Sequence, residues 1–485
     1  MNAIANLSPQ IVWKNFYDLT QIPRPSKFEQ EAAKYICDFG KNLGLESFQD
    51  EVGNVIIRKP ATPGMEDRMG IILQAHIDMV PQKNNDVEHD FKKDPIKPRI
   101  VDNMVYATGT TLGADNGLGC AVAMAVLEQN DLVHGPIEVL ITIDEETGMT
   151  GARALQPGVL KGDILINLDS ETEGELYVGC AGGLDTNAEF KYKEEALPKE
   201  LVQFEVAVKG LRGGHSGMEI NEGRGNSNKI MARLLLPILR DMGGRLISIE
   251  GGNMRNAIPR EAVAYIAIPA GKVSKAKKHV AKVTAEVKAE YKPIDPGVEV
   301  YFTKSAGAKK CVPAEVAVKV MQAVYACPSG VDRMSLVMDN LVDTSNNLAI
   351  VKSEKGKIVV RTLMRGSCDT AKHDLSEAIR AVFELAGAKV AFTGGYSGWQ
   401  PNMESPILKT MKETYKNLYG VEADVKAIHA GLECAIISNN YPHWDMISCG
   451  PTLMSPHSPE ERVLIPTVEK WWNFLVEALK NAPVK

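Results

Sequence analysis

Histidine and acidic residues recur directly after short apolar runs of this 485-residue chain. Four of these runs are typical of buried strands, and the charged residues stand where or soon after the strands would end. The runs are Ile71–Ala75, Ile137–Ile143, Ile164–Leu168 and Met446–Cys449, and the residues are His76, Asp78, Glu145, Glu146, Asp169 and His457, with Asp115 in a glycine-rich segment that leads into a helix. In an open α/β sheet, ligands bind beyond the carboxyl ends of the strands, so we expect these side chains to lie at one rim.

Five separate segments of the chain deliver these residues to the rim, and their imidazole and carboxylate groups suit zinc, manganese or cobalt. Five such ligands exceed what one tetrahedral ion takes, whereas two ions ~3.5–4 Å apart share one carboxylate and one water. The shared water ionises near neutral pH, and a carboxylate that is not a ligand is then needed to accept its proton. Adjacent Glu145 and Glu146 suit these two roles, and Asp78 is spaced to hold the ring of His76.

Each of these residues alone is also typical of a helix cap or a solvated loop charge, and Asp115 alone suits a cap of the following helix. The metal-site hypothesis therefore depends on their joint placement. Other chemistries lack their motifs: the chain has no G-x-S-x-G elbow, no phosphate-binding G-x-x-x-x-G-K-[ST] loop, no G-x-G-x-x-G and no H-E-x-x-H.

Composition excludes several classes of protein. The net charge of −6 argues against a nucleic-acid partner held by phosphate contacts, and 44% apolar with 24% charged residues is typical of a soluble globular chain. No apolar run approaches the ~18 residues of a membrane span, and MNAIANLSPQIVWKNF has no signal-peptide pattern. The 8 cysteines are scattered without a CxxC pair, which favours a cytoplasmic location and argues against both a disulfide framework and a cysteine-type zinc site.

The secondary-structure pattern predicts two domains. Strands and helices alternate in the first third, where Ser26-x-x-Glu29 has the pattern of a capping box for a helix that ends at Gly44. The pattern of predicted strands and helices changes near 185, and 297–392 has the β-α-β-β-α-β order of a compact α+β unit. The α/β texture returns after Gly394 and Gly395. We therefore expect an α/β domain, with a central mixed sheet flanked by helices, made of 1–185 and 396–485 and interrupted by an α+β domain of 186–395.

Eight segments carry a family likeness: LQAHIDMV, TTLGADNGLG, TIDEETGMTGA, INLDSETEG, GLRGGHSGMEI, RNAIPRE, IHAGLECAI and GPTLMSPHSPEE. They resemble the two-zinc dipeptidase, aminoacylase and carboxypeptidase family of metallopeptidases, and within it the bacterial aminoacyl-histidine dipeptidases. The motifs extend over nearly the whole chain.

The resemblance implies a role for each residue at the rim. His76 and Asp169 would bind one metal, Glu146 and His457 the other, and Asp115 would bridge them. Glu145 would be the general base and then the general acid, and Asp78 would orient His76. The family's peptide bond after the bridging aspartate is commonly cis, which applies here to Asp115–Asn116.

The resemblance also implies that 186–395 is a lid and dimerisation domain. His215 would stabilise the tetrahedral intermediate, often in the partner subunit's site, and Asn256 and Arg365 would contact substrate. Guanidinium binds carboxylate in a bidentate manner, which suits Arg365 for the terminal carboxylate of the peptide, with Arg361 as a competitor. His429 and Glu433 would support the wall of the site.

The function expected from the resemblance is hydrolysis of short unblocked dipeptides, preferentially Xaa-His, by a cytoplasmic homodimer. Each subunit would hold two divalent ions, zinc first, with cobalt or manganese as alternatives. No nucleic-acid or membrane partner is expected. Two alternatives use the same site: an N-acyl amino-acid deacylase and a tripeptidase. A third belongs to another class, a non-catalytic metal-dependent binding or scaffold protein.

Overall fold

The computed structural model describes residues 3–485, which divide into two compact units. Unit 1 consists of the described residues up to Gly179 together with Pro401–Ala427 and Leu432–Lys485. Unit 2 consists of Cys180–Gln400 and Ile428–Gly431. The sequence-based division at 185/186 and 395/396 did not include this short second segment of unit 2. Within residues 3–485, no helix combines the length and the apolar character that crossing a membrane requires.

Unit 1 is built on a mixed sheet of eight strands, which confirms the predicted fold class. The strand order is β1 (Glu46–Gln49), β2 (Val55–Lys59), β6 (Ile137–Thr142), β3 (Ile71–His76), β7 (Ile164–Asn167), β23 (Asp445–Ser448), β8 (Glu175–Cys180) and β22 (Asp424–Ile428). The neighbours β6, β3, β7 and β23 run parallel, and they include every strand that the sequence pattern singled out at the rim. Strands buried on both faces read as continuous apolar runs, which is why these four were recognisable.

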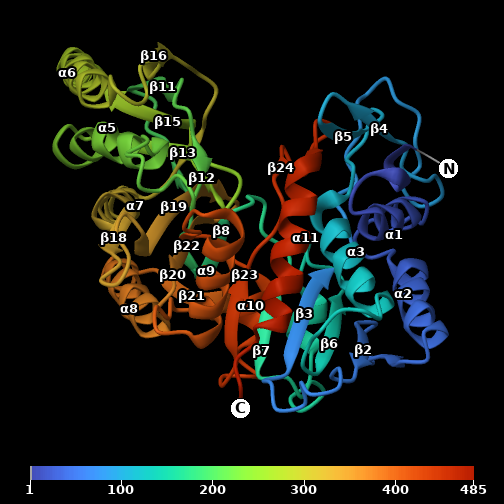
Figure 1. Ribbon diagram of the computed structural model, residues 1–485. Helices are drawn as coiled ribbons and strands as arrows, with labels where there is room; N and C mark the ends of the chain where they lie inside the picture. The colour runs from blue at the N-terminus through green and yellow to red at the C-terminus, as the bar shows by residue number, and fades with distance from the viewer. Residues whose placement is uncertain (1–2) are drawn as a thin grey trace. The chain divides into compact units, whose positions relative to one another are not determined.

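Helices pack on this sheet and on one another. They are α1 (Gln10–Thr20), α2 (Gln30–Asn42), α3 (Ala114–Glu128), α4 (Thr150–Ala154), α9 (Pro406–Tyr419), α10 (Glu433–Ile437) and α11 (Ile465–Lys480), preceded by the 3₁₀ turn η1 (Ala3–Asn6). Helix α3 packs on β3 and α1 packs on α3, while α9 contacts β23 and α11 (Figure 1). A small antiparallel sheet joins β24 (Leu453–Met454), β25 (Arg462–Leu464), β5 (Met104–Ala107) and β4 (Pro98–Val101).

The predicted capping box at the start of α2 is wrong. Neither side chain caps the helix: the hydroxyl of Ser26 donates to Asp78 Oδ2 at 2.8 Å, and Glu29 Oε1 accepts the backbone N–H of Asp144 at 2.9 Å. Both partners lie beyond the ends of β3 and β6, so tertiary contacts have outcompeted the local ones. The predicted end of the helix is confirmed, since Gly44 has the left-handed φ of +76°.

Unit 2 contains a nine-stranded antiparallel sheet, in agreement with the predicted α+β texture. Its order is β16 (Glu299–Lys304), β11 (Leu201–Lys209), β15 (Ala262–Pro269), β13 (Arg245–Gly251), β19 (Val342–Glu354), β20 (Lys357–Gly366), β9 (Gly182–Lys191) and β21 (Lys389–Tyr396), with β18 (Gly330–Met334) paired to β19. Two further pairs are short: β10 (Glu195–Ala196) with β17 (Lys310–Cys311), and β12 (Gly214–His215) with β14 (Ala257–Ile258).

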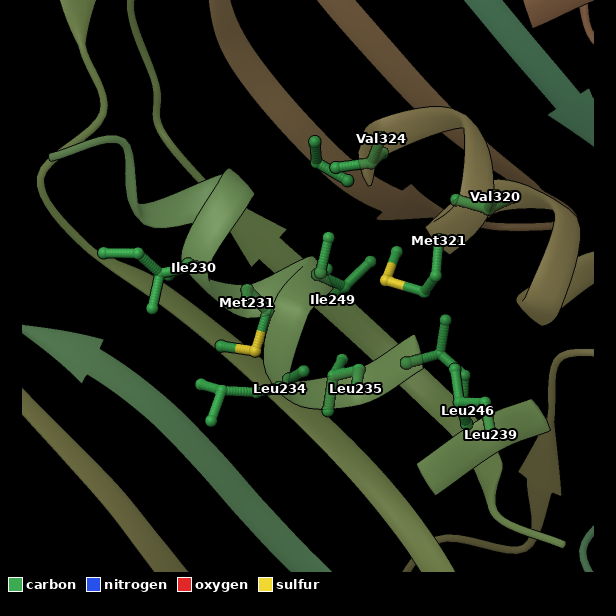
Figure 2. Packing of buried hydrophobic residues seen from close by; sticks show 14 of the residues in the cluster. Ile230, Met231, Leu234, Leu235, Leu239, Leu246, Ile249, Val320, Met321 and Val324 are labelled. Atoms are coloured by element: carbon green, nitrogen blue, oxygen red, sulfur yellow. The ribbon is translucent and has the colours of Figure 1, made fainter. Parts of the chain in front are cut away.

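The helices of unit 2 bury the apolar side chains of this sheet. They are α5 (Ser227–Asp241), α6 (Val273–Tyr291), α7 (Ala314–Ala326) and α8 (Asp369–Leu385), with the 3₁₀ turn η2 (Ala270–Lys272). Figure 2 shows Met231 and Leu235 of α5 among Leu246 and Ile249 of β13 and Met321 of α7. This apolar cluster lies within unit 2 and gives it a core of its own.

Candidate functional site

The charged residues that follow the parallel strands of unit 1 come together at one edge of the sheet. His76 is the last residue of β3, while Glu145 and Asp169 follow β6 and β7. His457 lies beyond β23, and Asp115 lies in the first turn of α3. The predicted convergence of these side chains is confirmed by their mutual distances, given below.

Asp115 stands between two histidines. Its Oδ1 lies 3.1 Å from His76 Nε2, and its Oδ2 lies 3.0 Å from His457 Nε2. Each imidazole nitrogen also faces a second carboxylate: Asp169 Oδ1 is 3.4 Å from His76 Nε2, and Glu146 Oε2 is 3.0 Å from His457 Nε2. Two triads of ligand atoms, each within 4.8 Å of one another, therefore share Asp115. The Asp115–Asn116 peptide bond is cis, as the resemblance implied.

The carboxylates of this cluster stabilise positive charge beside them. Burial alone would lower the pKa of His76, but the carboxylates of Asp169 and Asp115 outweigh burial and raise this pKa well above its usual value. Hydrogen bonds to Asp115 and Glu146 raise the pKa of His457 to about 11. Burial raises the pKa of the Asp169 carboxyl to about 6. Either protons on the imidazoles or bound cations can supply this positive charge.

The donor set fits two divalent cations. Asp115 offers one oxygen to each triad, and each triad adds one imidazole nitrogen and one further carboxylate. Glu146 Oε1 is buried and has no hydrogen-bond partner, so it is an acceptor that a cation would satisfy. Nitrogen and oxygen ligands without thiolate suit zinc, cobalt and manganese alike.

Asp78 organises the residues around this centre. Its carboxylate is fully buried and lies 3.4 Å from His76 Nδ1. It also accepts the backbone N–H groups of Glu145 at 2.9 Å and Glu146 at 3.2 Å. Asp78 therefore holds both the ring of His76 and the turn that carries the two adjacent glutamates.

Glu145 belongs to the same cluster and is more accessible than Asp78. Its carboxylate lies with His76 and Glu146 in a group whose ligand atoms are within 4.8 Å of one another. Burial, together with the carboxylates of Asp169 and Glu433, raises the pKa of Glu145 well above its usual value. A carboxyl group so placed, beside the paired ligands rather than between them, is suited to exchange a proton with a reacting water.

Three buried charged residues at this edge make contacts that no sequence pattern predicts. Arg24 donates to the carbonyl oxygens of Ile77 at 2.7 Å and Gly113 at 2.6 Å. Glu433 accepts from Gln74 and from Thr142, both at 2.6 Å, and burial raises its pKa to about 8. Glu461 accepts backbone N–H groups just before Asp115. Two of them stand in motifs of the sequence: Glu461 in the same motif as His457, and Glu433 in IHAGLECAI. Arg24 stands in no such motif.

Unit 2 carries a second polar cluster around Arg365, which is 5% exposed. Its hydrogen bonds are long: Arg365 donates to Ser216 Oγ and to the hydroxyl of Tyr396, both at 3.4 Å, and the Nε2 of His215 lies 3.5 Å away. Among residues 3–485, no aspartate or glutamate forms an ion pair with Arg365. A buried guanidinium with only weak neutral partners is suited to bind an incoming carboxylate.

His215 adds a second donor to this cluster. Its Nδ1 accepts the backbone N–H groups of Gly217 at 3.2 Å and Met218 at 3.1 Å, so its proton lies on Nε2, which faces Arg365. Burial and the charge of Arg365 lower the pKa of His215. Asn256 is exposed and lies in the turn before β14, where its carbonyl oxygen accepts the N–H of Ser216 at 2.8 Å. The Nε2–H group of His215 and the guanidinium of Arg365 are therefore neighbouring donors.

His429 and Glu433, which the sequence analysis treated as a pair, belong to different units. His429 lies in the short segment Ile428–Gly431 of unit 2, where its Nε2 is 2.7 Å from Ser345 Oγ. Burial, followed by the charge of Arg365, lowers the pKa of His429 to about 3. The imidazole is therefore neutral at physiological pH and adds no charge beside Arg365.

We expect His429 to make stability depend on pH between about 3 and its ordinary value of 6.5. The unfolded chain binds a proton there below about pH 6.5, whereas the folded protein does not, so stability falls as pH falls through this range. His429→Gln removes the effect, by up to about 1.4 kcal/mol per pH unit. Urea unfolding of both proteins at pH 4 to 7 measures it. A stability difference between them that stays constant with pH would contradict the assignment.

Comparisons with known proteins agree with this architecture. Residues 72–481 match the model of a family described as peptidase family M20/M25/M40. The cytosol non-specific dipeptidase of Escherichia coli (strain K12) is 44% identical over 485 residues, with 100% of each chain covered. The crystal structure of aminoacylhistidine dipeptidase from Vibrio alginolyticus has a TM-score of 0.94 and 44% identity, covering 100% of this chain and 99% of that one. Aminopeptidase PepT from Bacillus cereus, at 17% identity and a TM-score of 0.59 over 98% and 99% of the chains, shows the fold alone.

Proposed function

The chain belongs to peptidase family M20/M25/M40, and on that basis we propose that it hydrolyses short dipeptides with free termini, Xaa-His dipeptides preferentially, at a two-metal centre. One observation carries the two-metal part of the proposal: the two carboxylate oxygens of Asp115 face separate imidazoles, each with its own further carboxylate. His76 and Asp169 would hold one ion, Glu146 and His457 the other, and Asp115 both. Zinc is the first candidate.

The chemistry divides between the ions and the chain. Two bound divalent cations would polarise the scissile carbonyl and lower the pKa of a water. Glu145 takes the proton of the attacking water and delivers it to the leaving amine, since it lies close to His76 and Glu146 and the two triads that share Asp115 do not include it. Asp78 keeps the ring of His76 in one orientation through Nδ1.

Unit 2 would recognise the substrate. Arg365 would bind the terminal carboxylate, because it is buried and forms no ion pair with an acidic side chain of the described residues. His215, with its Nε2 proton, would stabilise negative charge that develops on the scissile carbonyl oxygen. Asn256 would contact the same substrate from the neighbouring segment. The competitor Arg361 lies four residues before Arg365 on β20, about 13 Å along the strand, too far to share one carboxylate with it.

One of the two relatives is named a non-specific dipeptidase and the other an aminoacylhistidine dipeptidase. A panel of substrates tests which preference this chain has. We expect hydrolysis of carnosine and other Xaa-His dipeptides faster than Gly-Leu, and little hydrolysis of Gly-Gly-Gly or N-acetyl-methionine. A preference for the tripeptide or the acetylated amino acid would replace the proposal with a tripeptidase or a deacylase. No hydrolysis by protein loaded with zinc, cobalt or manganese would favour the non-catalytic binding protein.

Arg365→Ala is expected to raise KM for a free dipeptide by about 10- to 100-fold, because a hydrogen-bonded charge pair of this kind contributes about 1.5–3 kcal/mol. KM for the same dipeptide with a C-terminal amide should change little, since the amide carries no charge to lose. Arg361→Ala is the matched control and should alter KM less than about threefold. A large effect of Arg361→Ala with a small effect of Arg365→Ala would exchange the two roles.

The protein is proposed to be a cytoplasmic homodimer that associates through unit 2. Strand β18 pairs only with β19 among the described residues, so one of its edges is open. Apolar side chains on and after this strand are exposed, with Leu336 at 90%, Val337 at 56% and Met334 at 41%. Cys37, Cys120, Cys311, Cys327, Cys368 and Cys449 are free thiols, which suits a reducing compartment.

The double substitution Leu336→Asp and Val337→Asp is expected to turn the dimer into a monomer, because it buries two charges in the contact. Leu385→Asp, at a residue that is 88% exposed on α8, is the control and should leave the dimer intact. Sedimentation velocity distinguishes the species. A monomeric wild type, or a double variant that still dimerises, would overturn this surface.

A further inference from the structure

Glu461 makes an unusual set of contacts near the proposed metal centre. It is 2% exposed, and each of its carboxylate oxygens accepts two backbone N–H groups. Oε2 accepts from Leu112 at 2.7 Å and Gly113 at 2.9 Å, and Oε1 accepts from Ala114 at 2.7 Å and Asp115 at 3.2 Å. All four donors belong to the segment that leads into Asp115.

These contacts differ from ordinary capping of a helix. A cap satisfies donors in the first turn from a residue next to it, whereas Glu461 lies 346 residues from Asp115 and also binds the N–H groups of Leu112 and Gly113, which precede α3. Burying a carboxylate is costly, and charge-assisted hydrogen bonds to all its lone pairs are what offset that cost. The segment before Asp115 is thus held in one conformation by a distant residue.

Glu461 is also close in sequence to His457. The backbone N–H of Glu461 donates to the carbonyl oxygen of Ser458 at 3.0 Å, which closes a turn directly after His457. One side of the segment before Asp115 is held by Glu461, and its Gly113 carbonyl oxygen is held by Arg24, which also binds Ile77 beside His76. Asp115 and His457 are therefore joined by a short path through Glu461.

We propose that Glu461 is a positioning residue, which sets the distance between Asp115 and His457 so that the pair can hold a bridged second cation. The inference rests on the proposed two-metal function. Glu461 itself contacts only backbone, so it acts through Asp115 and His457 and takes no part in proton transfer.

Glu461→Gln tests this role with little change in shape. Whichever way the amide lies, its NH₂ group faces two backbone N–H donors that formerly had an acceptor, so the segment before Asp115 must shift. Glu460→Gln is the matched control, because Glu460 is the adjacent residue and is exposed. Glu461→Asp keeps the charge on a shorter side chain and serves as the conservative variant.

The measurements are cobalt binding, the visible spectrum and spin coupling of the cobalt-loaded protein, and kinetics at saturating metal. We expect the wild type and Glu460→Gln to bind two coupled ions. Glu461→Gln should bind the second ion at least tenfold more weakly, lose the coupling and lose at least tenfold in kcat, with KM changed less than threefold. Glu461→Asp should restore part of the coupling and of kcat.

The outcomes separate the inference from the proposed function. A wild type that binds only one cobalt ion overturns the two-metal function and the inference with it. A wild type with two coupled ions and a Glu461→Gln variant with the same affinity, spectrum and kcat overturns the inference alone. If Glu461→Gln does not fold, as judged by circular dichroism, Glu461→Asp decides: a spectrum and an affinity equal to those of the wild type overturn the role.

Discussion

Glu145→Ala is expected to lower kcat by about 10²- to 10⁴-fold while both metal ions stay bound, because a positioned general base contributes a factor of this size. The carboxylate of Glu145 lies beside His76 and Glu146, but the two triads around Asp115 are complete without it. Removing it therefore removes the proton acceptor and leaves the ligands in place. Kinetics on an Xaa-His dipeptide, with metal content determined on the same sample, measure both quantities.

Glu146→Ala is the informative neighbour for this experiment. Glu146 Oε2 lies 3.0 Å from His457 Nε2, so its loss should weaken one ion as well as activity. Added metal should restore part of the activity of Glu146→Ala and none of that of Glu145→Ala. A metal-replete Glu145→Ala protein with activity near that of the wild type would remove Glu145 from the mechanism.

Asp115→Ala is expected to lose both ions together and to fall to the activity of chelator-treated wild type. Substitution of a residue that only supports a metal ligand lowers the affinity for the metal by about 10- to 100-fold. Loss of a carboxylate shared by both ions should lower the affinity for each ion by more than that. The two oxygens of Asp115 face different imidazoles, at 3.1 and 3.0 Å, so no other described ligand replaces it for either ion.

The single-ion variants Asp169→Ala and His457→Ala provide the contrast. Each substitution removes a side chain from one triad only, so each should weaken the binding of one ion selectively. Activity of the wild type should vanish with chelator and return with zinc, cobalt or manganese. Metal analysis that finds one ion fully bound in Asp115→Ala would contradict the bridging role.

Much of the proposed metal centre could be predicted from the order of residues in the chain. Buried parallel strands are continuous apolar runs, and the residues just beyond them meet at one edge of the sheet. For this reason His76, Asp169 and the pair at 145 and 146 were identifiable from local pattern alone. The motifs added the assignment of Asp115 as the shared ligand, and its position between the two imidazoles agrees with that assignment.

The polar cluster around Arg365 was less predictable. Arg361 and Arg365 stand on the same strand, and nothing in the local sequence of that strand distinguishes them. Only the folded structure shows that Arg365 is buried beside His215. It also shows that His429 belongs to unit 2 and Glu433 to unit 1. The neutral state of His429 follows from burial, which no short sequence pattern encodes.

What the sequence by itself determined is the four parallel strands of unit 1 and the polar residues that follow them, because periodicity and strand-end position are properties of neighbouring residues. The tertiary structure decided where polar side chains without such a pattern find their partners. Ser26 and Glu29 have the spacing of a capping box but bind Asp78 and the backbone of Asp144. Glu461 binds the segment before Asp115 across 346 residues of chain. Such bonds form between groups that only folding brings together, so their geometry cannot be read from local order.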